Sequence, residues 1–249
     1  MISTVDAKDA ASARRSPARR ALSAAVLWVV VEVCVRTAVP ALLLEVLYPP
    51  RVAMIPATAL ALAQIVPALV ALLFLWAVFD RRRRADGLSL WDLGYRFSAR
   101  SAVVGGVCGA LLLVALALPA QVDKRVFGLR ADIDRWAWLV DAGVWTAPAF
   151  LLVNAVLAPV VEEFGWRGYV QTRLATTWRS PVAVIVTALL FAGKHLIVDL
   201  SLIRTTVLIT ASLALGLTRL RLGTCASTMT HFVLNLIASV SALFEIPGL

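Results

Sequence analysis

Seven long apolar segments limit what this chain can fold into more than any other feature of the sequence. A helix needs about 20 residues to cross the hydrocarbon core of a bilayer, and each segment is near that length. Apolar residues make up 61% of the chain and charged residues 16%, which is far from the balance of a soluble domain. The sequence therefore predicts an all-α, polytopic transmembrane helical bundle of seven spans, or of eight if the first segment breaks at Pro40. The segments cover about residues 22–48, 52–79, 101–120, 136–163, 181–198, 202–218 and 224–244.

The chain divides into three predicted regions. Residues 1–20 are rich in Ala, Ser and Arg, and we expect a disordered basic cytoplasmic tail there. Residues 21–135 hold the N-terminal transmembrane helices, and the first of them is too long for the apolar part of a cleaved signal peptide. Residues 136–249 form a helical core that carries the polar residues discussed below.

Basic residues gather between the spans, and this pattern predicts the orientation of the chain. The formal net charge is +9, and most basic clusters lie on one side if the spans alternate in direction. Positive charge favours the cytoplasmic side, so we expect an integral membrane protein with a cytoplasmic N-terminus. The Ala- and Arg-rich composition favours a bacterial cell membrane. No basic patch is interleaved with aromatic residues, so nucleic acid is not an expected partner. The clusters are residues 1–20, 81–100 and 167–179, and the pair Arg219 and Arg221.

One loop on the basic side has a helical pattern of its own. Leu88, Trp91 and Tyr95 recur at helical spacing between the second and third spans. This spacing predicts an amphipathic helix that lies in the membrane interface.

Ionisable residues inside the spans need an explanation, because each costs about 2.5 kcal/mol or more at mid-helix. Glu32 and Arg36 lie four residues apart on the first span, and we expect a structural ion pair there. A second group combines carboxylates, an amide and the only two histidines of the chain, and such a combination favours a functional site. Its members are Glu162, Glu163, Arg167, His195, His231 and Asn235.

Helical spacing predicts how these side chains are arranged. Glu163 and Arg167 share a helix face, so Arg167 is expected to neutralise Glu163. Glu162 is turned away from Glu163 by about 100° and stays free for chemistry. His231 and Asn235 also share a face, so we expect both to project into one cavity.

The depths of these groups agree only if the fourth helix continues past Glu163 to about Arg173. At a rise of 1.5 Å per residue, Glu162, Asn235 and the two histidines then lie about 12 to 21 Å from the cytoplasmic ends of their helices. The sequence therefore predicts this continuation, and it predicts a kink at Pro159 that admits water.

Three motifs occur in order along this part of the chain. They are Glu-Glu-x-x-x-Arg at 162–167, Phe-x-x-x-His at 191–195 and His-x-x-x-Asn at 231–235. Together they resemble the signature of the CPBP intramembrane proteases, which include type II CAAX prenyl proteases and the bacterial Abi and lysostaphin-resistance-like proteins. The resemblance covers about residues 140–245, and it implies that residues 136–249 are a CPBP-type catalytic core with intramembrane endopeptidase activity.

The resemblance also implies a role for each residue. Glu162 and His195 would activate water, while His231 and Asn235 would stabilise the oxyanion. This division suits peptide hydrolysis, which needs a base for the attacking water and donors for the developing negative charge.

The remaining motif residues would support the site. Glu163 and Arg167 match the supporting pair of the family. Lys194 departs from the family pattern, which more often has an apolar residue before the histidine. We expect Lys194 either to snorkel or to perturb the protonation of the site.

A metal-dependent version of the mechanism uses the same residues. Glu162, His195 and His231 match the ligands of a hydrolytic zinc site with water in the fourth position, and Glu163 would then be the base. The chain has no HExxH motif. The sequence leaves open both the zinc mechanism and the glutamate mechanism, which needs no cofactor.

Two functions from other classes also remain open. A non-catalytic membrane scaffold or bacteriocin-immunity protein could have the same fold. A small transporter could use the buried polar layer, although no internal repeat is evident. The expected partner of a protease is a membrane-associated peptide or protein, and the eukaryotic relatives cut prenylated C-terminal tails.

Overall fold

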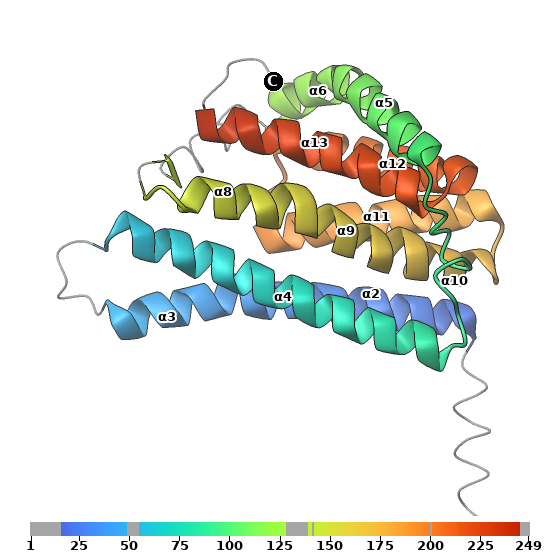
Figure 1. Cartoon of the computed structure of the whole chain (residues 1–249), viewed down its shortest axis with the longest axis horizontal. Helices are drawn as coiled ribbons and strands as arrows, with labels where there is room; N and C mark the ends of the chain where they lie inside the picture. The colour runs from blue at the N-terminus through green and yellow to red at the C-terminus, as the bar shows by residue number, and fades with distance from the viewer. Residues whose placement is uncertain (1–15, 49–54, 128–138, 141, 200, 245–249) are drawn as a thin grey trace, which may run out of the picture.

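The computed structural model describes residues 16–48, 55–127, 139–140, 142–199 and 201–244. All regular elements in these ranges are helices, and seven of the helices are long and apolar enough to cross a membrane (Figure 1). The predicted all-α transmembrane bundle is confirmed, with seven spans in the described ranges. These spans are Pro17–Leu47, Ala57–Ala85, Ala99–Phe127, Thr146–Ala175, Ser180–Asp199, Thr205–Leu222 and Thr224–Phe244.

The first span passes Pro40 without a break. It consists of α2 (Pro17–Val33), the π-helical segment η1 (Cys34–Ala38) and α3 (Val39–Leu47). Proline has no N–H to donate, and the wider π-helical turn before it accommodates the missing bond. The span begins at Pro17, so residues 17–20 of the predicted tail belong to the first helix. The rest of the predicted tail, residues 1–15, lies outside the described residues.

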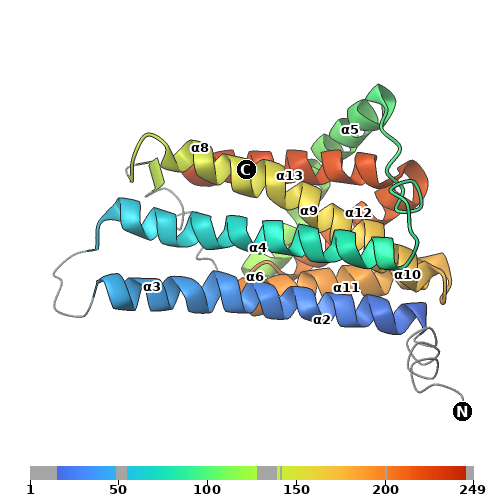
Figure 2. The ribbon, with the colours of Figure 1, turned by 60° about the horizontal axis from the view of Figure 1, so that its bottom comes forward.

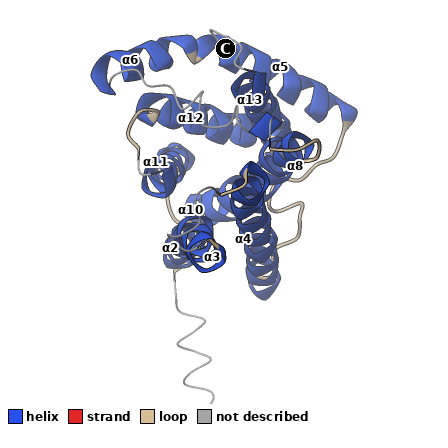
Figure 3. Ribbon diagram, turned by 90° about the vertical axis from the view of Figure 1, so that its left-hand side faces the viewer, coloured by secondary structure: helices blue, strands red, loops and turns tan. Residues whose placement is uncertain are grey.

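The second and third spans pack in different ways. The second is a single helix, α4 (Ala57–Ala85), and the third consists of α5 (Ala99–Ala115) and α6 (Ala117–Phe127). Figure 3 shows α5 and α6 lying across one edge of the bundle, outside α12 (Thr205–Leu222) and α13 (Thr224–Phe244). A Cβ atom at Gly105 would lie 2.5 Å from the Ala226 carbonyl oxygen, and one at Gly109 would lie 2.8 Å from Val233 Cβ. The two glycines therefore let α5 approach α13 closely.

The loop between α4 and α5 is not the predicted interfacial helix. Residues 86–98 form a series of turns, and Gly94 has a φ of 85°. Leu93 is fully buried, and its carbonyl accepts a hydrogen bond from the Thr224 hydroxyl. The Thr224 N–H donates to the Gly94 carbonyl at 2.9 Å. The loop therefore docks on the start of α13, because these contacts outweigh the helical spacing of its apolar residues.

The fourth span continues past the paired glutamates, as predicted. It runs without interruption from Thr146 to Ala175, a length of 30 residues. A π-helical segment precedes Pro159, so the missing proline N–H is absorbed there as it is in the first span. The segments are α8 (Thr146–Leu151), η2 (Leu152–Leu157), α9 (Ala158–Glu162), η3 (Glu163–Gln171) and α10 (Thr172–Ala175).

The fifth span, α11 (Ser180–Asp199), completes the bundle. In Figure 2 the first, second and fourth spans run alongside one another, and α11 lies beside α2. The arrangement brings segments from the two halves of the chain together: η3 contacts α2, α4, α11, α12 and α13. Among the described residues, η3 is therefore packed against five other spans.

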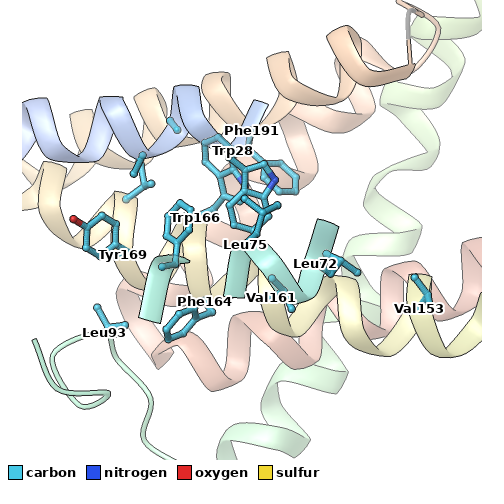
Figure 4. Packing of buried hydrophobic residues seen from close by; sticks show 14 of the residues in the cluster. Trp28, Leu72, Leu75, Leu93, Val153, Val161, Phe164, Trp166, Tyr169 and Phe191 are labelled. Atoms are coloured by element: carbon cyan, nitrogen blue, oxygen red, sulfur yellow. The ribbon is translucent and has the colours of Figure 1, made fainter. Parts of the chain in front are cut away.

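An aromatic cluster holds α2 against the fourth span. The centroid of the Trp28 ring lies 5.1 Å from that of the Phe79 ring. The Trp166 ring centroid lies 5.6 Å from that of Trp28 and 5.7 Å from that of Phe191 (Figure 4). A Cβ atom at Gly165 would lie only 2.2 Å from an atom of the Trp28 ring. The absence of a side chain at Gly165 therefore lets α2 approach η3.

Candidate active site

The fourth span supplies two buried carboxylates to the middle of the bundle. Glu162 ends α9 and Glu163 begins η3, and both are almost fully buried. Arg167 lies one turn further along and is fully buried as well. Charged groups in such a place need partners, and the partners come from three other helices, α11, α12 and α13.

Glu163 has the most complete set of contacts. Its Oε1 lies 3.0 Å from Arg167 Nη1, so the predicted pairing of these two residues is present. The Ser227 hydroxyl of α13 donates to Oε2. Arg167 in turn donates from Nη2 to the Ser212 hydroxyl of α12 at 2.8 Å. These contacts tie η3 to α12 and α13 and leave Glu163 as an ionised acceptor.

His231 lies between the two carboxylates. Its Nδ1 is 3.0 Å from Glu163 Oε1, and its Nε2 is 3.7 Å from Glu162 Oε2. A carboxylate only accepts hydrogen bonds, so Nδ1 carries the hydrogen and donates the hydrogen bond to Glu163. The 3.7 Å separation on the other side is too long for a direct hydrogen bond. Glu163 therefore orients the ring so that Nε2 faces Glu162.

Lys194 binds the other oxygen of Glu162. Its ammonium lies 2.5 Å from Glu162 Oε1 and 2.9 Å from Glu32 Oε2, and only 1% of the residue is exposed. Lys194 therefore does not snorkel. Glu32 also lies 3.5 Å from Arg36, so the predicted pair on the first span is present, but it is not separate from the site.

The charges of this network balance. With His231 neutral, the described network contains as many cations as carboxylates, so the network as a whole carries no net charge. Balance matters because removing one partner of a buried pair leaves an uncompensated charge in the interior. The cations are Arg36, Lys194 and Arg167, and the carboxylates are Glu32, Glu162 and Glu163.

His195 does not join this network. The centroid of its ring lies 4.9 Å from that of the Phe191 ring. The Phe191 ring centroid in turn lies 6.0 Å from that of the His231 ring. The Nδ1 atom of His195 is 4.0 Å from Asp199 Oδ2, and the side chain is 20% exposed. Among the described residues, no hydrogen bond or ion pair joins His195 to Glu162. The sequence predicts that both histidines lie beside Glu162. In the structure His231 does, and His195 does not.

Asn235 lies one turn beyond His231 and contacts a different part of the fourth span. Its Nδ2 donates to the Asn154 carbonyl at 2.9 Å, and the Asn154 side chain donates to Ser239 at 2.7 Å. These bonds tie α13 to η2. They use one of the two N–H groups of the Asn235 amide and leave the other for a further acceptor.

The residues proposed as zinc ligands do not form a ligand set in this arrangement. In the described part of the chain, no three His, Cys, Asp or Glu side chains are placed to hold one metal ion. Glu162 and His231 face each other, but one oxygen of Glu162 binds Lys194 and His195 lies beyond the Phe191 ring. The donor set therefore does not fit a zinc ion without rearrangement.

A hollow within the membrane-spanning part reaches the network at Arg36. Its walls come from the first, second and fourth spans and are mostly apolar. Arg36 is 31% exposed and pairs with Glu32, which contacts Lys194. The lining residues are Arg36, Gln64, Ile65, Ala68, Phe150, Val153 and Asn154.

The loop after α4 packs against η3. The Tyr95 ring lies 6.1 Å from the Phe164 ring. Burial raises the pKa of the Tyr95 hydroxyl, and the negative charge of Glu163 raises it further. Tyr95 is therefore a neutral phenol beside the site at ordinary pH.

Comparison with known families supports the resemblance seen in the motifs. Residues 144–237 match the family model described as type II CAAX prenyl endopeptidase Rce1-like. This segment is therefore similar to the Rce1-like family. It contains all three motifs and lies inside the predicted core, and the family is consistent with the CPBP proteases. The Rce1-like family implies a membrane protease that acts on peptide substrates. Comparisons with curated proteins and with solved structures gave no match.

Three partners of the site are absent from the set predicted from the sequence. Glu32 contacts Lys194 and is not only a partner of Arg36. Ser212 binds Arg167, and Ser227 binds Glu163. Nothing in the sequence marks the two serines as site residues, because serine is common in transmembrane helices. Glu32 is marked as a candidate, since it is a carboxylate inside an apolar span.

Proposed function

We propose that this chain is an intramembrane endopeptidase in which Glu162 activates the water that hydrolyses a peptide bond. The observation that carries the proposal is the pairing of a buried Glu162 with the Nε2 atom of His231, in a segment that matches a protease family. The 3.7 Å between Glu162 Oε2 and His231 Nε2 suits two groups that hold one water from either side.

The proposed mechanism assigns the proton transfers to Glu162. The water donates one hydrogen to Glu162 Oε2 and the other to His231 Nε2, and its oxygen attacks the carbonyl carbon. Glu162 accepts the proton during attack and delivers it to the leaving nitrogen. Because His231 Nδ1 donates to Glu163, the neutral ring accepts at Nε2. Of the two oxyanion donors implied by the resemblance, Asn235 then retains a free N–H for that role.

The substrate class follows from the family and the position of the site. We propose a membrane-associated peptide or protein, cut near a C-terminal tail, that reaches the network through the hollow beside Arg36. The Ala- and Arg-rich composition favours a bacterial cell membrane protein, and the basic loops favour a cytoplasmic N-terminus. Glutamate chemistry needs no cofactor, and a requirement for zinc is tested by activity after exhaustive chelation.

Comparative proteomics of cell membranes tests the proposal. Cells expressing the wild type should contain peptide C-termini that are absent from cells expressing Glu162→Gln. Glu45→Gln is the matched control, because Glu45 is an exposed carboxylate on the first span. His231→Ala should remove more activity than His195→Ala. Identical sets of C-termini from the wild type and Glu162→Gln would favour the non-catalytic scaffold or immunity protein.

A further inference from the structure

Lys194 makes two of the closest contacts in the buried network. Its ammonium bridges a carboxylate of the fourth span and a carboxylate of the first, at 2.5 Å from Glu162 and 2.9 Å from Glu32. The side chains of all three residues are at most 5% exposed. A charge placed so deep is expensive, so the arrangement calls for an explanation.

The contacts divide the two oxygens of Glu162 between two tasks. Oε1 accepts from Lys194, and Oε2 faces His231 Nε2 across 3.7 Å. Rotation of the carboxyl group would exchange the two oxygens, and the bond to Lys194 opposes this rotation. Lys194 therefore keeps Oε2 available for the water and directed at the ring.

We propose that Lys194 is a positioning residue for Glu162, and that Glu32 holds Lys194 in place. The inference rests on the proposed function, because positioning has a purpose only if Glu162 is the base. Glu32 lies on α2, outside the matched segment 144–237. The first span is therefore part of the catalytic apparatus of this chain.

The alternative is that Lys194 and Glu32 only neutralise each other. Charge balance separates the two cases. Lys194→Met leaves one excess negative charge, Glu32→Gln leaves one excess positive charge, and the double variant restores balance. A structural pair is replaceable by the neutral double variant, whereas a positioning pair is not.

The experiment measures unfolding in detergent and turnover in liposomes for Lys194→Met, Glu32→Gln and the double variant. Turnover uses a peptide whose C-terminus appears in the proteomic comparison. We expect both single variants to be less stable to unfolding than the wild type, and we expect the double variant to recover this lost stability. Its kcat should stay at least tenfold below the wild type with KM nearly unchanged. Lys194→Arg should retain more kcat than Lys194→Met, and Lys124→Met is the exposed control.

Wild-type kcat in the double variant would overturn the inference, while the loss of activity in Glu162→Gln would still support the proposed function. A second measurement does not depend on cleavage. A double-mutant cycle on stability between Lys194→Met and Glu162→Gln should give a coupling energy, because the two groups are in contact. Additive effects in that cycle would also overturn the inference.

Discussion

The close approach of α2 to η3 at Gly165 should be measurable as a packing cost. An alanine Cβ there would lie 2.2 Å from one atom of the Trp28 ring, which is 1.2 Å short of the 3.4 Å where ordinary contact begins. Trp28 cannot move aside easily, because it is fully buried against Phe79 and Trp166. Overpacking of this kind costs about 1–3 kcal/mol. In the opposite direction, alanine inside a helix stabilises the protein by about 1 kcal/mol relative to glycine.

Gly106→Ala isolates the packing cost from this gain. A Cβ at Gly106 meets nothing within 4 Å, so that variant has only the helical gain. Chemical unfolding in detergent should therefore place Gly165→Ala about 1–3 kcal/mol below Gly106→Ala. Turnover should fall as well, because Trp28 and Glu32 lie one turn apart on α2 and a displaced α2 separates Glu32 from Lys194. Equal stability of the two variants would refute the reasoning that Gly165 sets this distance.

Three further predictions concern packing, charge and access. Gly105→Ala should unfold about 1–3 kcal/mol more easily than Gly106→Ala in the same assay, because its Cβ would lie 2.5 Å from a backbone oxygen of α13. Arg167→Met should destabilise the protein by about 3–5 kcal/mol by leaving Glu163 buried without its cation, and adding Glu163→Gln should recover most of this loss in chemical unfolding. Ala68→Trp should fill the hollow and raise KM with little change in kcat, and an unchanged KM would exclude the hollow as the substrate route.

The features that depend on one segment were predictable from the sequence. Segment length and hydropathy gave the seven spans, and the depth argument gave the continuation of the fourth span past Glu163. The pairing of Glu163 with Arg167 followed from their spacing of four residues. In each case the decisive geometry lies within a single helix, where the rise and the turn per residue are fixed.

The loop between α4 and α5 shows where such reasoning fails. Its apolar residues recur at helical spacing, yet Leu93 is buried against the start of α13 and Gly94 takes a positive φ. The Thr224 hydrogen bonds that fix the loop come from a segment about 130 residues away. A periodic pattern predicts a buried face, but the surface that buries it decides whether a helix forms.

His231 and Asn235 illustrate a second limit. They share a helix face, as predicted, but one turn of separation gives them different neighbours. His231 faces the two glutamates, while Asn235 binds the Asn154 carbonyl, two turns before Glu162 on the fourth span. Spacing along a helix fixes the direction in which a side chain points around the axis of that helix. It does not fix what the opposite helix presents at that height.

The depth of Glu32 in its span also predicts that it belongs to the site. It lies 15 residues from the start of its span, about 22 Å at 1.5 Å per residue. Lys194 lies about 21 Å from the start of α11, and Glu162 about 20 Å from the end of α10. Three ionisable groups at one depth, in an environment that penalises unpaired charge, are candidates for mutual contact whatever their distance in sequence. Equal depth therefore predicts partners between spans where spacing within one helix cannot.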